Sequence, residues 1–304
     1  MKIVYAGSPE FAVAPLRALI EAGKEVVAVI TQPDKPVGRK RVITPTAVKA
    51  FAQVRNIPVY DFVKIRDHAE EVSALGADVM ITCAYGQLLT QDILDAFPVG
   101  VYNLHASLLP AFRGASPIQS AILSGCEETG VTVMKTELSL DSGAVLLRKR
   151  ADVGNKTCAQ LSEELSALSA KAVLEAVELL ESGNYTLVPQ DGDKATFCKK
   201  ISKEDARVRF DRSAFEVSRL INAMNPSPVA YCNLSGGAVN LYCATPCEGK
   251  GECGEVIKAD KNGIVIACKE GAVNVTELQF AGGKVVAARD AVNGRKVKVG
   301  DRFD

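Results

Sequence analysis

The sequence predicts an α/β fold in which a mostly parallel, doubly wound sheet precedes a small β-barrel. In the first half, short β-rich runs alternate with helical patterns, which is the order of βαβ units. Several of those runs are continuously apolar, as strands covered on both faces are. After residue 232, short strand-like segments follow one another between glycine turns. The expected class is therefore a Rossmann-like domain followed by an OB-like barrel.

The elements of the first half follow from apolar runs and helix end signals. Pro9 at the start and Gly23 at the end delimit the first helix, and Gly76 closes a later one. Strands are expected at 2–6, 25–31, 78–85, 99–105 and 131–136, and helices at 9–23, 44–56, 66–76 and 117–125.

The second half begins with a long amphipathic helix at 157–183, closed by Gly183. The segment 188–208 is charged and weakly periodic, which favours a linker. A helix from residue 214 is stopped by Asn-Pro-Ser-Pro, and only short strands follow until the Val-Asn-Gly stretch near residue 293. We expect an α/β domain at 1–189, a linker at 190–207 and a barrel at 208–304.

Bulk properties exclude several classes of protein. Of 304 residues, 47% are hydrophobic and 24% are charged, and no apolar run approaches the roughly 20 residues that span a bilayer. The start, MKIVYAGSPEF, lacks the features of a signal peptide, so we expect a cytoplasmic protein without membrane association. Nine cysteines, an odd number, fit reduced thiols. The spacing of Cys243, Cys247 and Cys253 favours free thiols in a loop over a zinc site.

A pair of polar residues at the end of an apolar run is the first candidate site. Asn103 and His105 are two residues apart on a predicted strand, so both side chains lie on one face. In such sheets, ligands bind at the carboxyl ends of the strands. An amide donor beside an imidazole suits acyl transfer, with an oxyanion to stabilise and a proton to move. A purely structural role is the alternative: the two side chains would be buried and would form hydrogen bonds with backbone groups near a turn.

The stretch NLHASLLPAFRGASP resembles a signature of enzymes that transfer or release the formyl group of 10-formyltetrahydrofolate. The signature reads N-x-H-x-S-x-L-P and then R-G-x-x-P. The matching residues are Asn103, His105, Ser107, Leu109, Pro110, Arg113, Gly114 and Pro117. The resemblance implies a third catalytic residue, an aspartate after the strand GVTVM, which is Asp141 here. A turn-forming Asp-Ser-Gly explains Asp141 equally well, and both roles are compatible.

The resemblance extends over nearly the whole chain and implies a function. Further matches include MKIVYAGSPEFAV, TQPDKPVGRKRVITPTAVK, QDGDKATFCKKISKED and NAMNPSPVAY. They imply that a monomer transfers the formyl group to the α-amino group of methionine on initiator methionyl-tRNA, without a metal. The first domain would be catalytic, and the barrel would bind tRNA. The alternative is a sugar-nucleotide formyltransferase that uses the same folate donor.

The site residues that the resemblance implies fall into three groups. The catalytic residues would be Asn103, His105 and Asp141. The folate would lie against two irregular segments, with Tyr85, Gly86, Gln87, Leu88, Ser107, Leu108, Leu109 and Pro110. The tRNA would contact basic side chains in the loop 34–45 and in the linker, namely Arg39, Lys40, Arg41, Lys199, Lys200 and Lys203. Without the resemblance, the arginines of this loop would be interpreted as part of a basic turn that is exposed to solvent.

Overall fold

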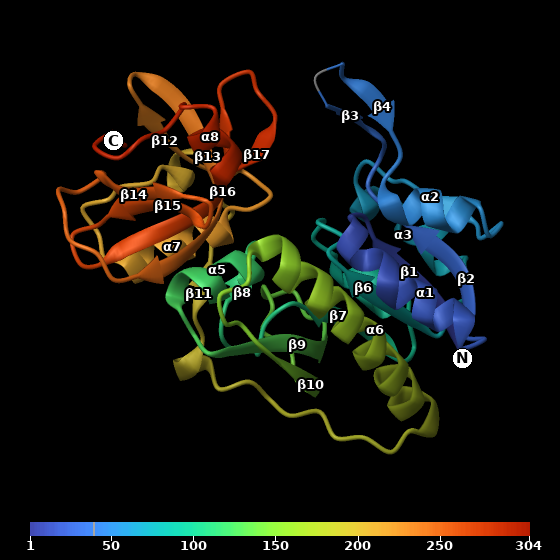
Figure 1. Cartoon of the computed structure of the whole chain (residues 1–304). Helices are drawn as coiled ribbons and strands as arrows, with labels where there is room; N and C mark the ends of the chain where they lie inside the picture. The colour runs from blue at the N-terminus through green and yellow to red at the C-terminus, as the bar shows by residue number, and fades with distance from the viewer. Residues whose placement is uncertain (39) are drawn as a thin grey trace. The chain divides into compact units, whose positions relative to one another are not determined.

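The computed structural model describes residues 1–38 and 40–304 (Figure 1). Contacts divide the chain into two compact units. The first unit holds residues 1–114, 129–152 and 162–198, and the second holds 115–128, 153–161 and 199–304. The domain limits expected at 189 and 208 stay a prediction, because this grouping changes at 198/199 and assigns two internal segments to the second unit.

The first unit is built on a mostly parallel sheet, as the sequence predicts. Its strand order is β10-β9-β7-β6-β1-β2-β5, and β1 pairs in parallel with both β2 and β6. The pairing of β9 with β7 is antiparallel, so the parallel arrangement ends at β7. The strands are β1 (Lys2–Gly7), β2 (Glu25–Ile30), β5 (Val59–Tyr60), β6 (Val79–Cys83), β7 (Gly100–His105), β9 (Glu128–Lys135) and β10 (Val145–Asp152).

Most helices of the first unit lie within one residue of the predicted ranges, whereas α4 and η3, at residues 91–95 and 192–194, were not predicted. Thr46 caps one of them, because its hydroxyl accepts a hydrogen bond from the Lys49 backbone N–H. They are η1 (Glu10–Ala12), α1 (Val13–Glu21), α2 (Ala47–Gln53), η2 (Ile65–Asp67), α3 (Ala69–Ser73), α4 (Gln91–Asp95), α6 (Cys158–Ser182) and η3 (Gly192–Lys194). The first four residues of α6 belong to the second unit.

The hairpin in the basic loop and the edge strand of this unit were also not anticipated. The basic loop is a hairpin of β3 (Lys35–Val37) and β4 (Val42–Thr44), which projects from the unit in Figure 1. The strand β10 lies at the edge of the sheet, and after its first three residues exposed and half-buried side chains alternate. An edge strand with one solvated face carries charges, so its segment VLLRKRAD lacks the continuous apolar run of a central strand.

The second unit contains an antiparallel sheet whose order is β12-β13-β16-β15-β14, with β17 paired to β16. The C-terminal residues connect its two edges. Asn233 and Asp304 exchange backbone hydrogen bonds of 3.0 and 3.1 Å, and Phe303 N donates to Gly254 O at 2.8 Å. The strands are β12 (Ala230–Leu234), β13 (Gly237–Cys247), β14 (Val256–Asp260), β15 (Gly263–Ala267), β16 (Ala272–Phe280) and β17 (Val285–Ala287). The expected barrel is therefore present.

Helices of this unit pack on an apolar core shared with the barrel strands. Val217 and Ile221 of α7 are buried with Leu241 and Val273, and Leu123 of α5 packs against the same cluster. Ser213 and Glu216 form a capping box that fixes the start of α7. The helices are α5 (Pro117–Ser124), η4 (Glu204–Ala206), α7 (Ala214–Ala223) and α8 (Ala288–Asn293).

The segment expected as a linker is structured along much of its length. It contains η3, η4 and the short strand β11 (Phe197–Cys198), which pairs with β8 (Arg113–Gly114). Within the described ranges, no helix has both the length and the apolar character that crossing a membrane requires.

Candidate active site

Asn103 lies near the end of β7, where its side chain is half-buried. Thr82 on the neighbouring strand β6 faces it, and Thr82 Oγ1 donates to Asn103 Oδ1 at 2.8 Å. That bond uses the amide oxygen and fixes the orientation of the amide. Asn103 Nδ2 has no hydrogen-bond acceptor in the described part of the chain, so both of its protons are available to a ligand.

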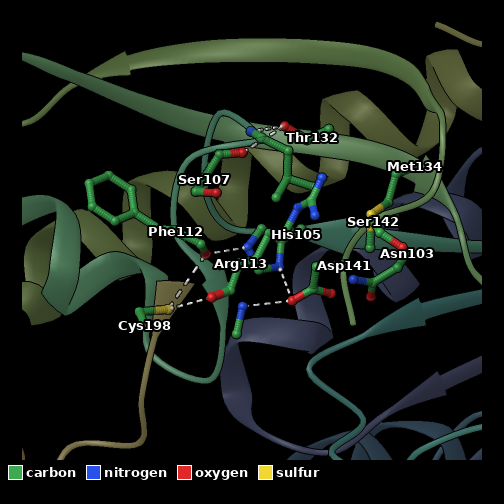
Figure 2. A network of polar contacts seen from close by, with 12 residues as sticks. Asn103, His105, Ser107, Phe112, Arg113, Thr132, Met134, Asp141, Ser142 and Cys198 are labelled. Carbon is green, nitrogen blue, oxygen red and sulfur yellow. Dashed lines mark hydrogen bonds and ion pairs between the residues drawn. The ribbon is translucent and has the colours of Figure 1, made fainter. Parts of the chain in front are cut away.

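His105, the last residue of β7, is buried and has an oxygen atom near each ring nitrogen. Its Nε2 lies 2.9 Å from the Phe112 carbonyl oxygen, and its Nδ1 lies 3.6 Å from Asp141 Oδ2 (Figure 2). A carbonyl oxygen can only accept a hydrogen bond, so Nε2 carries a proton. In the neutral ring, Nδ1 therefore presents a lone pair on the side of Asp141.

Asp141 lies in the loop between β9 and β10. Its Oδ2 accepts a 2.8 Å hydrogen bond from Gly114 N, and its backbone has a φ of 49°, a region that aspartate tolerates better than most residues. Gly143 makes the turn possible, because a Cβ there would lie 1.8 Å from Lys135 O. The predicted turn former is thus also the residue that the fold brings to His105.

The segment after His105 is braced by hydrogen bonds inside the first unit. Thr132 Oγ1 donates to Ser107 O at 2.7 Å and accepts from Leu109 N at 3.1 Å. Gly114 has a φ of 118°, and a Cβ there would lie 2.3 Å from Cys198 O, so the β8–β11 pairing requires glycine. These contacts hold the Phe112 carbonyl toward His105.

Gln190 makes four hydrogen bonds to Arg113, Asp141 and Gly143 next to this site, and its Nε2 also lies 3.8 Å from Met134 Sδ. Its Oε1 accepts from Arg113 Nε at 3.1 Å and from Arg113 Nη2 at 2.8 Å. Its Nε2 donates to the carbonyl oxygens of Asp141 at 2.9 Å and Gly143 at 2.7 Å. Sequence reasoning did not single out Gln190 or Thr82. Gln190 begins the family-like stretch QDGDKATFCKKISKED, but no local pattern shows what either side chain bonds, because their partners lie 20 or more residues away along the chain.

The predicted folate residues have different surroundings. Leu88 is 79% exposed, whereas Tyr85 is buried, and this burial raises the pKa of its hydroxyl. The Gln87 side chain donates to Phe62 O at 2.9 Å and accepts from Ile65 N at 2.8 Å. Gly86, with a φ of 83°, turns the chain between them.

The second predicted folate segment, Ser107 to Pro110, has several polar groups already bonded within the protein. Ser107 is fully buried, and its Oγ donates to Ala111 O at 2.5 Å. Leu109 is also buried, Leu108 is half-buried, and Pro110 O accepts from Thr196 N at 3.2 Å. A folate role for these residues stays a prediction.

A cavity of about 670 Å³ lies in the same unit. Apolar Leu94, Phe97 and Val101 line it, together with the strand end Lys135–Thr136 and the loop residues Glu137 to Ser139. The loop continues to Asp141. Thr136 Oγ1 is buried without a hydrogen-bond partner in the described residues. None of the eight predicted folate residues is among those that line the cavity.

The predicted tRNA residues lie at exposed positions, except that Arg39 falls outside the described residues. Lys40 and Arg41 lie between β3 and β4. Lys199 pairs with Asp205 at 3.1 Å, and Lys203 Nζ lies 5.8 Å from the centre of the Tyr231 ring. Hydrogen bonds from Ser202, then from Lys199, hold the pKa of Asp205 at about 2. Lys200 is exposed.

Across residues 1–38 and 40–304, no three His, Cys, Asp or Glu side chains are placed to hold a metal ion. The geometry offers an amide donor, an imidazole and a carboxylate at one edge of a sheet.

The chain matches two protein-family models. Residues 1–177 match the model described as "Formyl transferase", and residues 200–296 match "Formyl transferase, C-terminal domain". A methionyl-tRNA formyltransferase of Stutzerimonas stutzeri (strain A1501) is 44% identical over 299 residues, which cover 97% of this chain and 95% of that protein.

Two solved structures share the fold. HypX from Aquifex aeolicus, in complex with tetrahydrofolic acid, has a TM-score of 0.67 at 20% identity; the match covers 98% of this chain but only 48% of HypX. WlaRD, a sugar 3N-formyl transferase crystallised with dTDP and 5-N-formyl-THF, has a TM-score of 0.69 at 17% identity, over 93% of this chain and 99% of that one.

Proposed function

The chain belongs to the formyl transferase family, and on this premise we propose that it transfers a formyl group from 10-formyltetrahydrofolate to methionine on initiator methionyl-tRNA. The observation that carries the proposal is the 44% identity, over almost the whole of both chains, to a methionyl-tRNA formyltransferase. The matched sugar 3N-formyl transferase, at 17% identity, is more distant and supports the alternative only at the level of the fold.

In the proposed reaction, the α-amino nitrogen of the esterified methionine attacks the formyl carbon of the folate. The carbonyl oxygen becomes an oxyanion, the bond from the formyl carbon to N10 then breaks, and one amine proton ends on N10. Asn103 Nδ2, unbonded within the described protein, donates to the oxyanion. Because Thr82 fixes the amide beforehand, the donor costs little reorganisation in the transition state.

His105 moves the proton in this scheme. Nε2 is committed to the Phe112 carbonyl, so Nδ1 is the nitrogen that accepts the amine proton and passes it on. The imidazolium formed in between carries its charge 3.6 Å from the Asp141 carboxylate, which stabilises it. Gly114 N holds that carboxylate in place.

The 670 Å³ cavity beside the Asp141 loop is the proposed place for the pterin. Its volume lies in the range of small-ligand sites. Apolar side chains of Leu94, Phe97 and Val101 suit the ring faces, and the Glu137–Ser139 loop leads directly to Asp141. The exposed Leu88 would cover part of the remaining folate.

The basic hairpin β3–β4 and the lysines of the 199–203 segment are the proposed phosphate contacts. Val37, Val42 and Ile43 are also more than half exposed, which suits a hairpin that meets a partner. Phosphate contacts release counterions, so tRNA binding should weaken steeply as the salt concentration rises.

The assay that tests this function supplies 10-formyltetrahydrofolate with either methionyl-tRNA or an amino-sugar nucleotide. Formylation of methionyl-tRNA alone, slower at higher salt, is the expected result. Arg39→Ala should reduce the salt slope of tRNA affinity by about one unit, whereas Lys171→Ala, an exposed helix residue, should not. Formylation of the amino sugar and not the tRNA would establish the alternative function.

Asp141→Asn should lower kcat by about 100-fold, with tRNA affinity unchanged. Asparagine tolerates the φ of 49°, and its oxygen can still accept from Gly114 N, so the turn persists. The charge that faces His105 is lost. Steady-state kinetics and a tRNA-binding titration check this result. Normal turnover with weak tRNA binding would instead make Asp141 only a turn former.

A further inference from the structure

Gln190 joins two segments that the proposed reaction needs at a fixed distance. On one side are Arg113 and, next to it, Gly114, whose N–H holds the Asp141 carboxylate. On the other side are the carbonyls of Asp141 and Gly143. All the hydrogen-bonding capacity of the amide is used: two bonds accepted at Oε1 and two donated from Nε2.

The orientation of this amide is determined by its partners. Arg113 can only donate, and the two backbone carbonyls can only accept, so Oε1 faces Arg113 and Nε2 faces the loop. The segment that carries Gln190 is itself anchored. Val188 and Val145 exchange backbone hydrogen bonds of 2.8 and 2.9 Å, which tie this segment to β10.

The buried Arg113 explains why residue 190 is a glutamine. The residue is 8% exposed, and in the described ranges its guanidinium forms no ion pair with a carboxylate. A buried cation needs an acceptor, and Gln190 Oε1 takes two of its N–H groups. A carboxylate at position 190 would satisfy Arg113 as well or better, but it could not donate to the Asp141 and Gly143 carbonyls.

We propose that Gln190 is a positioning residue for formyl transfer: by bonding Arg113 and the 141–143 loop together, it sets the Asp141 carboxylate against His105. This role rests on the proposed function. It does not require Gln190 to touch either substrate. The residue therefore acts on the rate of the chemical step and not on tRNA affinity.

The discriminating variant is Gln190→Glu. It retains the acceptor for Arg113 and removes both donors to the loop. We expect kcat to fall by about 100-fold because Asp141 is displaced, with the KM for methionyl-tRNA unchanged within about twofold. The melting temperature should not fall, since the buried guanidinium gains a counter-charge. Gln279→Glu is the matched control: Gln279 also accepts two side-chain hydrogen bonds and donates to a backbone carbonyl, that of Gly283, in the second unit.

A second readout does not depend on activity. The chain has two histidines, so NMR resolves the imidazole resonances of His105 and His68. In Gln190→Glu, the His105 resonances should shift because its carboxylate neighbour moves, while those of His68, paired with Glu71 at 2.7 Å, stay in place.

Unchanged kcat with unchanged His105 resonances would overturn the proposal. So would a loss of activity that only matches a loss of folded protein, because that outcome marks a purely structural role. If the wild type does not formylate methionyl-tRNA, the proposed function fails, and the NMR comparison still decides whether Gln190 positions Asp141.

Discussion

Replacing His105 with alanine is expected to lower kcat for formyl transfer by about 100- to 10,000-fold, the usual contribution of a positioned acid–base group. The imidazole is the proton carrier of the proposed reaction, and the chain's other histidine stacks on Phe62 and pairs with Glu71. Folate and tRNA affinities should stay near those of the wild type. Single-turnover kinetics at saturating substrates measure the chemical step.

Folding is expected to survive this change. The Phe112 carbonyl loses the histidine donor but keeps the Cys198 thiol at 3.5 Å. Added imidazole should enter the vacated space and restore part of the rate in His105→Ala. His68→Ala is the matched control and should retain activity. Turnover of His105→Ala near the wild-type level would remove the catalytic assignment.

Replacing Asn103 is the second large effect. Asn103→Ala should lower kcat by about 100- to 1000-fold, the typical loss when one oxyanion donor is removed. Asn103→Asp is a sharper test, because the carboxylate keeps the acceptor for Thr82 Oγ1 and replaces the outward donor with a negative charge. It should lose at least as much activity as the alanine variant.

The double variant Asn103→Ala/His105→Ala should lose less than the product of the two single losses, because both residues act on one transition state. A complete double-mutant cycle on kcat measures this coupling. Strictly multiplicative losses would mean that the two side chains act independently, contrary to the proposed mechanism.

Much of the fold follows from local sequence. The apolar runs IVYA, VVAVI and GVY form largely buried strands because a strand covered on both faces favours continuous apolar residues. Pro117 and Gly125 delimit α5 because each suits one helix end. The period of a strand likewise places Asn103 and His105 on one face.

Other features depend on residues distant in the sequence. The edge strand β10 alternates and carries charges, so its segment resembles a loop until β9 pairs with it. The expectation of a self-contained domain at 1–189 omits Gln190, which bonds Arg113 from 77 residues away. It also includes α5, whose Leu123 packs on the barrel core.

The candidate site divides in the same way. The sequence by itself determined the chemical groups: an amide and an imidazole two residues apart on a strand, and an aspartate in a tight turn that the family resemblance singled out. Only the tertiary structure decided their mutual geometry, including the 3.6 Å approach of Asp141 to His105 and the bonds from Thr82 and Gln190 that orient them. The physical reason is that side-chain hydrogen bonds between distant segments leave no periodic trace in the sequence, whereas strand and helix periods do.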